Sequence, residues 1–224
     1  MTFSISARCT QSGRMGIAIS SSSPAVAARC AHARAGAGVV ASQNVTDPAL
    51  GHKGLALLAE GRTARETLAA LLDGYSFAAY RQLAIVDRAG GTAVFSGEGA
   101  LGTHGTCEGD NCVAAGNLLS NETVPAAMVR AFEAARGELG DRLLAAMEAA
   151  LAAGGEAGPV HSAGMVIVDR VSWPVVDLRV DWHEEDPIGA LNDLWTRYKP
   201  QVDDYVKRAL NPAAAPSYGV PGDL

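Results

Sequence analysis

The clustering of predicted strands into hairpins constrains this chain most, because it disfavours a parallel, doubly wound sheet. The first hairpin pairs alternating apolar and small polar residues at 2–7 and 15–20 across the turn Gln11-Ser12-Gly13-Arg14. Hairpins separated by pairs of helices favour antiparallel sheets with helices on their outer faces. We therefore predict an α+β fold, with two antiparallel sheets between two helical layers.

The expected elements follow from periodicity and from helix start signals. Asp47-Pro48, Asp186-Pro187 and the capping-box pattern of Thr63 and Glu66 each predict the first turn of a helix. Residues 23–31 are either a further strand or irregular. In chain order, the other expected elements are strands at 2–7, 15–20 and 36–43, helices at 47–59 and 63–74, strands at 82–87, 92–96, 100–106 and 111–116, helices at 122–136 and 138–153, strands at 163–168 and 175–180, and a helix at 186–210.

Composition and charge exclude several classes of protein. Hydrophobic residues make up 48% of the 224 residues, enough for a sizeable core, which at 5% aromatic content must be mainly aliphatic. The net charge of −6 and the absence of a basic stripe argue against nucleic acid as a partner. No segment has the roughly 18 uninterrupted apolar residues of a membrane span, and no signal peptide pattern opens the chain. We expect a cytoplasmic protein with no membrane partner.

The four cysteines, Cys9, Cys30, Cys107 and Cys112, do not form a metal-binding pattern. Cys107 and Cys112 are too loosely spaced for a zinc knuckle, and no second close pair completes one. We expect reduced thiols and no metal. No phosphate loop and no dinucleotide fingerprint is present, so no cofactor is predicted.

Segments spread over residues 2–190 carry a resemblance to a known family. They are Thr2-Phe3-Ser4-Ile5, Gly16-Ile17-Ala18-Ile19-Ser20-Ser21, His32-Ala33-Arg34-Ala35-Gly36-Ala37-Gly38, Ser42-Gln43 with Asp47-Pro48 and Gly51, Gly54-Leu55-Ala56-Leu57-Leu58, Arg81-Gln82 with Val86-Asp87, Gly116-Asn117-Leu118-Leu119, Gly154-Gly155-Glu156, Ser162-Ala163, and Asp177-Leu178-Arg179-Val180-Asp181 with His183. In their order they resemble the domain-of-unknown-function family numbered 1028, which is grouped with the N-terminal-nucleophile (Ntn) hydrolases. The resemblance implies a four-layer αββα sandwich.

The chain departs from that family in one region. Glu156 stands where the family tends to have Asp. Gly158, Pro159 and His161 stand where a basic and an amide side chain are expected. If either missing group serves the site, the substrate or the activity differs from that of other members.

The resemblance implies a candidate nucleophile at the start of the chain. In Ntn enzymes the side chain of the first residue attacks, and its own α-amine is the base. Removal of Met1 would give Thr2 this role, because a hydroxyl needs such a neighbouring base. The expected reaction is hydrolysis of a C–N bond in a small molecule. The alternative is a structural Thr at a strand start, in a non-catalytic ligand-binding or assembly protein.

Further candidates are polar residues near predicted strand ends, each with a structural alternative. Ser20 and Ser21 would line the site, or form a polar strand end. Arg34, with His32 on the same segment, would stabilise the developing anion or form a rim salt bridge. Ser42, Gln43 and Asn117 would donate to an oxyanion, or cap a helix and hold a turn.

The C-terminal part of the chain bears on assembly. Trp195, Tyr198 and Tyr205 give the last helix an aromatic face, which packs on a neighbouring copy or on the chain's own sheet. We expect a homo-oligomer. A single domain is predicted over residues 1–210, followed by a Pro/Ala/Gly-rich tail at 211–224.

Overall fold

Two antiparallel sheets form the centre of the computed structural model, which describes residues 2–220. The six-stranded sheet has the order β10-β9-β2-β1-β8-β7, and the four-stranded sheet the order β3-β4-β5-β6. The strands are β1 (Thr2–Arg8), β2 (Met15–Ser21), β3 (Ala31–Arg34), β4 (Gly38–Asn44), β5 (Arg81–Asp87), β6 (Thr92–Ser96), β7 (Gly105–Gly109), β8 (Cys112–Asn117), β9 (Ser162–Val168) and β10 (Val176–Val180). The mixed α+β class with two antiparallel sheets is thus as predicted.

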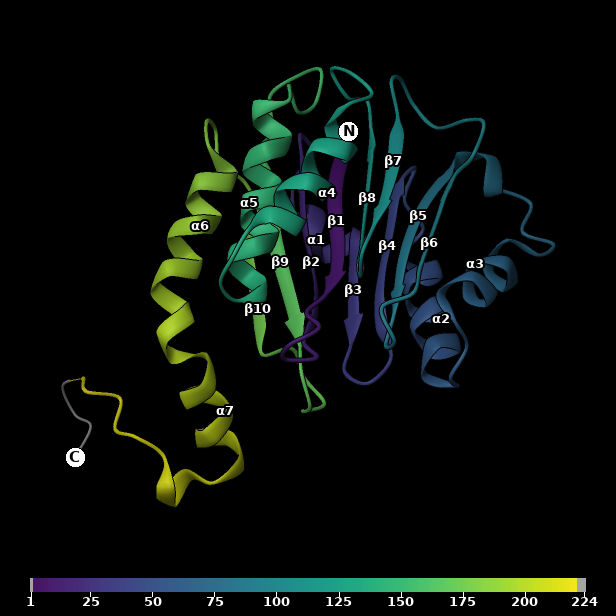
Figure 1. Ribbon diagram of the computed structural model, residues 1–224. Coiled ribbons are helices and arrows are strands. Elements are labelled where there is room, and N and C mark those ends of the chain that lie inside the picture. Colours follow the sequence, from purple (N-terminus) through teal and green to yellow (C-terminus); the bar gives the residue numbers. More distant parts are fainter. Residues whose placement is uncertain (1, 221–224) are drawn as a thin grey trace.

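Helices lie against both sheets (Figure 1). Helices α4 (Val124–Ala134) and α5 (Leu139–Ala152) pack on the six-stranded sheet through residues such as Phe132 and Met147. Helices α2 (Pro48–Ala59) and α3 (Ala64–Leu72) pack on the four-stranded sheet through Leu58 and Leu71. The predicted caps are present, since Asp47 and Asp186 accept from backbone N–H groups and Thr63 forms its capping box with Glu66.

Strand β1 shows how alternation divides the side chains between layers. Phe3 and Ile5 belong to the core under α4 and α5. Ser4 points the other way and bonds to Gln43 of the four-stranded sheet. Further along, the layer between the sheets is apolar, with residues such as Ile17 and Val39. The space between the sheets is therefore polar at the Thr2 end and apolar beyond it.

Three segments differ from the predicted elements. The undecided stretch 23–31 contains a short helix, α1 (Val26–Cys30), which begins after Ala25 at φ 51°. The strand predicted at 100–106 is wrong, because β7 begins only at Gly105. The helix predicted at 186–210 is two helices, α6 (Pro187–Tyr198) and α7 (Val202–Leu210), joined by a 3₁₀ turn that contains Pro200. Proline has no N–H to continue the helical hydrogen bonds.

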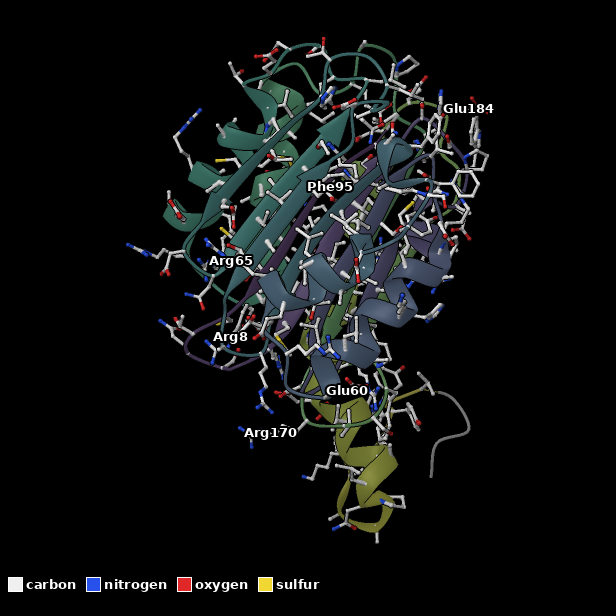
Figure 2. All side chains as sticks on the ribbon, turned by 90° about the vertical axis from the view of Figure 1, so that its right-hand side faces the viewer. Arg8, Glu60, Arg65, Phe95, Arg170 and Glu184 are labelled. Carbon is white, nitrogen blue, oxygen red and sulfur yellow. The ribbon has the colours of Figure 1, made fainter. Side chains whose placement is uncertain are left out.

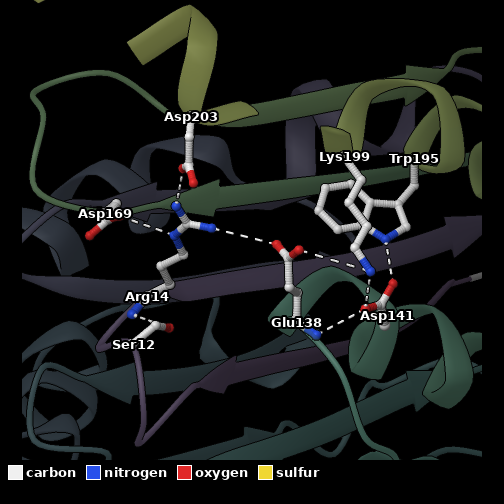
Figure 3. A network of polar contacts seen from close by, with 8 residues as sticks. All are labelled: Ser12, Arg14, Glu138, Asp141, Asp169, Trp195, Lys199 and Asp203. Carbon is white, nitrogen blue, oxygen red and sulfur yellow. Dashed lines mark hydrogen bonds and ion pairs between the residues drawn. The ribbon is translucent and has the colours of Figure 1, made fainter. Parts of the chain in front are cut away.

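A polar network fastens the C-terminal helices to the body of the protein (Figure 3). Asp141 of α5 accepts from Trp195 Nε1 at 2.9 Å and from Lys199 Nζ at 2.6 Å. Arg14, in the β1–β2 turn, bonds to Asp203 of α7 at 2.7 Å and also binds Asp169. The sequence left open whether the aromatic face packs on a neighbouring copy or on the chain's own sheet. Trp195 packs within the chain and is buried against α5.

Three further observations concern the sequence-based expectations. All four cysteines are free. Within residues 2–220, no group of three His, Cys, Asp or Glu side chains is placed to hold a metal ion. None of the helices in this range is long and apolar enough to cross a membrane.

Candidate functional site

Thr2 begins strand β1, which is flanked by β2 and β8 in the six-stranded sheet. It pairs with Asn117 of β8, and its Oγ1 lies 3.5 Å from Oγ of Ser21 at the end of β2. Its side chain is buried, with 5% of the residue exposed. The predicted nucleophile is therefore brought together with two of the other predicted residues, Ser21 and Asn117.

Beneath Thr2, buried amides connect the two sheets. Ser4 Oγ donates to Gln43 Oε1 at 2.7 Å. Gln43 Nε2 and Asn117 Nδ2 both donate to Gln82 Oε1, at 2.8 and 3.1 Å. Gln82 Nε2 donates in turn to Ser96 Oγ and to the carbonyl of Gly116. We call these residues, Ser4, Gln43, Gln82, Ser96 and Asn117, the amide network; it holds the ends of β1, β4, β5, β6 and β8 in one arrangement.

Gln82 was not among the residues predicted for the site. Its signal in the sequence is a polar side chain that opens an otherwise apolar strand, Gln82-Leu83-Ala84-Ile85-Val86. Such a residue is also typical of an exposed strand end. The pairing of β4 with β5 sets Gln43 opposite Gln82. The Gln82 side chain is fully buried and bonds to Gln43, so it points inward.

Glu156 is a second functional candidate that the sequence did not assign to the site. Its backbone forms an antiparallel bridge with Leu119, and its Oε2 accepts from the N–H of Ser22 at 3.3 Å. It is 5% exposed. Burial raises the pKa of Glu156 to about 7. Its signal in the sequence was its place in the Gly154-Gly155-Glu156 segment, where the family tends to have Asp.

The raised pKa of Glu156 gives a prediction for the chain that retains Met1. Between about pH 4.5 and 7 the folded chain keeps a proton that the unfolded chain has released, so the free energy of unfolding falls as pH rises. Glu156→Gln removes this dependence, and at pH 8 we expect the variant to be more stable by about 3 kcal/mol. Urea unfolding at pH 4 and pH 8 measures the difference. Equal stabilities at pH 8 would contradict the prediction.

Ser20 and Ser42 are buried, but their hydroxyls hold backbone groups. Ser20 Oγ donates to the carbonyl of Ser162 at 2.9 Å. Ser42 Oγ donates to the carbonyl of Asp47 at 2.8 Å, where α2 begins. Both bonds fit the structural alternatives, a strand end and a helix start, and neither is to Thr2.

His32 and Arg34 are placed away from Thr2. The His32 ring fills the space beside Gly51 of α2, where an added Cβ would lie 2.1 Å from it, and its Nε2 contacts the carbonyl of Arg29 at 3.1 Å. Burial lowers the pKa of His32, so the ring is neutral near pH 7. Arg34 is exposed and pairs with Gly38, about 17 Å along β4 from Gln43. The structure does not bring this cation to the predicted nucleophile.

The opposite end of the sheets carries a separate cavity. It has a volume of about 660 Å³ and is lined by residues that include Arg8, Arg88 and Arg170. In Figure 2, Arg8 and Arg170 lie below the middle of the molecule and Glu184 lies near its top. Arg8 ends the strand that Thr2 begins, so this cavity lies about 20 Å from Thr2.

Comparisons with known proteins agree with the resemblance seen in the sequence. The model of a family of unknown function (DUF1028) matches residues 2–191. Protein SPO2555 from Silicibacter pomeroyi, described with the same family model, is 32% identical over 92% of this chain and 90% of its own, with a TM-score of 0.86. Comparison with curated proteins gives no match.

Two more distant structures are proteins described as Anbu, an ancestral beta-subunit. The protein from Yersinia bercovieri is 9% identical over 90% of this chain and 96% of its own, with a TM-score of 0.39. A Gly-1 mutant from Hyphomicrobium sp. strain MC1 is 11% identical over 92% of this chain and 100% of its own, with a TM-score of 0.43.

Proposed function

We propose that this chain, which belongs to the DUF1028 family of unknown function, is an N-terminal-nucleophile hydrolase that cleaves a C–N bond in a small molecule. The observation that carries the proposal is the position of Thr2. It begins a strand inside the larger sheet, beside Ser21, and above the amide network that ties both sheets together. A hydroxyl held in this way is ready to attack once an adjacent base is available.

Removal of Met1 supplies that base as the α-amine of Thr2, with an ordinary pKa of roughly 7.7–8.0. The amine accepts the proton of Oγ1 as the oxygen attacks the substrate carbonyl carbon. The C–N bond then breaks, the leaving nitrogen takes the proton, and an ester to Thr2 remains. Water hydrolyses this ester, releases the acid and restores the hydroxyl.

The polar neighbours of Thr2 receive revised roles in this mechanism. Ser21 Oγ, 3.5 Å from Thr2 Oγ1, orients the nucleophile. Gln43 and Asn117 act through the amide network, which keeps the strand ends from shifting. Ser20, Ser42, His32 and Arg34 are left out of the reaction because their contacts lie elsewhere.

The arrangement of layers supports the same superfamily. Helices α4 and α5 pack on the outer face of the six-stranded sheet, the two sheets share an apolar layer, and α2 and α3 pack on the four-stranded sheet (Figure 1). This order fits the four-layer αββα sandwich that we propose for the chain.

An acylating probe tests the proposal on the wild-type protein. We expect intact-mass measurement to show loss of Met1, since Met before a small residue is a usual aminopeptidase substrate. A β-lactone, which acylates activated hydroxyls, should then add one equivalent of mass, and peptide mapping should place it on Thr2. Protein that has lost Met1 and gains no mass at Thr2 would contradict the proposed nucleophile.

The position of Arg34 favours a second candidate function. The cation expected to assist the nucleophile ends β3, beside the far end of β4, and is exposed and without a place in the reaction. A non-catalytic member of the family would need no such group and would bind a small ligand with the same fold. Retention of Met1 in the purified protein, shown by intact mass, would support this alternative.

A further inference from the structure

The buried carboxylate of Glu156 accepts a hydrogen bond from Ser22, which follows the end of β2 next to the start of β1. We propose that Glu156 is a positioning residue, which accepts a hydrogen bond from the α-amine of Thr2 after Met1 is removed. The inference rests on the proposed function for the removal of Met1. It assigns to Glu156 the orientation of the base within the nucleophilic residue.

The pairing of β1 with β8 places the Glu156 backbone in line with β1. Thr2 pairs with Asn117, and in an antiparallel pair each step back along one strand matches a step forward along the other. Leu119 therefore corresponds to a position two residues before Thr2. Glu156 forms its bridge with Leu119, after Leu118 has turned the chain at φ 51°. Its backbone thus takes up the line of β1 just beyond the place where β1 begins.

The pairing of β1 with β2 places the carboxylate itself. Phe3 pairs with Ser20, so Ser22 corresponds to the position one residue before Thr2. The N–H of Ser22 donates to Glu156 Oε2 at 3.3 Å. Both neighbouring strands therefore lead to the same place, the point where a chain that starts at Thr2 presents its amine.

One oxygen of this carboxylate is left for a new donor. Glu156 Oε1 is buried and has no hydrogen-bond partner among the described residues. A buried acceptor without a donor is costly, and more so when it is charged. An α-ammonium group offers three N–H donors at a site where Ser22 supplies only one.

Three ionisable groups on the neighbouring segment, Cys30, His32 and Arg29, have contacts of their own. The Cys30 thiol, whose pKa is raised by burial, contacts Thr46 Oγ1 at 3.4 Å. The His32 ring, whose pKa is lowered by burial, contacts the Arg29 carbonyl. The Arg29 guanidinium bonds to the carbonyls of Pro24 and Ala25. None of these three groups bonds to Glu156.

The proposed hydrogen bond would orient the α-amine of Thr2 and would couple the titration of the amine to that of the Glu156 carboxyl. A hydrogen bond from the amine to Glu156 fixes rotation about the N–Cα bond, so that the nitrogen lone pair of the neutral amine faces Oγ1. The carboxyl and the amine interact, so the titration of each depends on the charge of the other. An ionised carboxylate within about 4–6 Å raises the pKa of the amine by about one to three units.

The test measures the pKa of the Thr2 amine directly. Protein with Thr2 as its first residue, verified by intact mass, is methylated at the amine with ¹³C-formaldehyde and cyanoborohydride as the hydride donor, and the chemical shift is followed by NMR against pH. We expect the amine pKa to fall by at least about one unit in Glu156→Gln, and to be largely kept in Glu156→Asp. Glu122→Gln removes an exposed carboxylate after β8 and should leave the amine pKa unchanged.

An equal amine pKa in the wild type and in Glu156→Gln would overturn the role of Glu156, even if Thr2 is acylated by the probe. A shifted amine pKa in a protein whose Thr2 hydroxyl does not react would instead overturn the proposed function and leave the contact standing. A shift of the same size in Glu122→Gln would also overturn the inference, because it would show a general effect of charge.

Discussion

Replacement of Thr2 by alanine is expected to lower the rate of acylation by a β-lactone probe by at least about 1000-fold. The change removes Oγ1, the only atom that attacks in the proposed mechanism, and keeps the α-amine. Alanine also removes the 3.5 Å contact of Thr2 Oγ1 with Ser21 Oγ. The rate is measured as the increase of adduct mass with time, at one probe concentration and at pH 8.

Two matched variants show whether the rate is lost because the nucleophile is missing or because the site around it is disturbed. Thr2→Ser keeps a hydroxyl next to the amine and should keep most of the rate. Ser21→Ala removes the neighbouring hydroxyl, and should lower the rate far less than Thr2→Ala does. If Thr2→Ala were acylated at the wild-type rate, the nucleophile would not be Thr2.

Much of the fold is predictable because local patterns agree with the tertiary structure. The alternation in β1 and β2 matches a sheet whose two faces contact different layers. The capping side chains of Asp47 and Thr63 act within a few residues of themselves, so the sequence contains all that they need. The break at Pro200 was equally visible as a proline within a predicted helix. The start of β7 was not, because its residues have little periodicity.

The candidate site is less predictable, because the register of strand pairing decides which of its residues lie close together. Arg34 and Gln43 are nine residues apart and near small residues, yet the β3–β4 hairpin sets Arg34 beside Gly38, at the end of β4 opposite to Gln43. Glu156 meets the end of β2 through a backbone bridge to Leu119 and a hydrogen bond from the N–H of Ser22. These tertiary contacts cannot be predicted from spacing along the chain. A prediction from residue type alone therefore includes Arg34 in the site and omits Glu156.

Replacement of Gln82 by alanine is expected to lower the free energy of unfolding by about 3–4 kcal/mol. Gln82 is fully buried and makes four hydrogen bonds, two accepted from Gln43 and Asn117 and two donated to Ser96 and Gly116. Alanine leaves the donors of Gln43 and Asn117 and the carbonyl of Gly116 buried without this partner, and adds a cavity. Urea unfolding near neutral pH measures the loss.

A matched glutamine controls for the substitution itself. Gln201 is exposed and donates only to the carbonyl of Arg197, so Gln201→Ala should change stability by less than about 0.5 kcal/mol. A double-mutant cycle of Gln82→Ala with Gln43→Ala should show a coupling of about 0.5–3 kcal/mol, because the two amides bond directly. Additive losses would contradict the amide network as a unit.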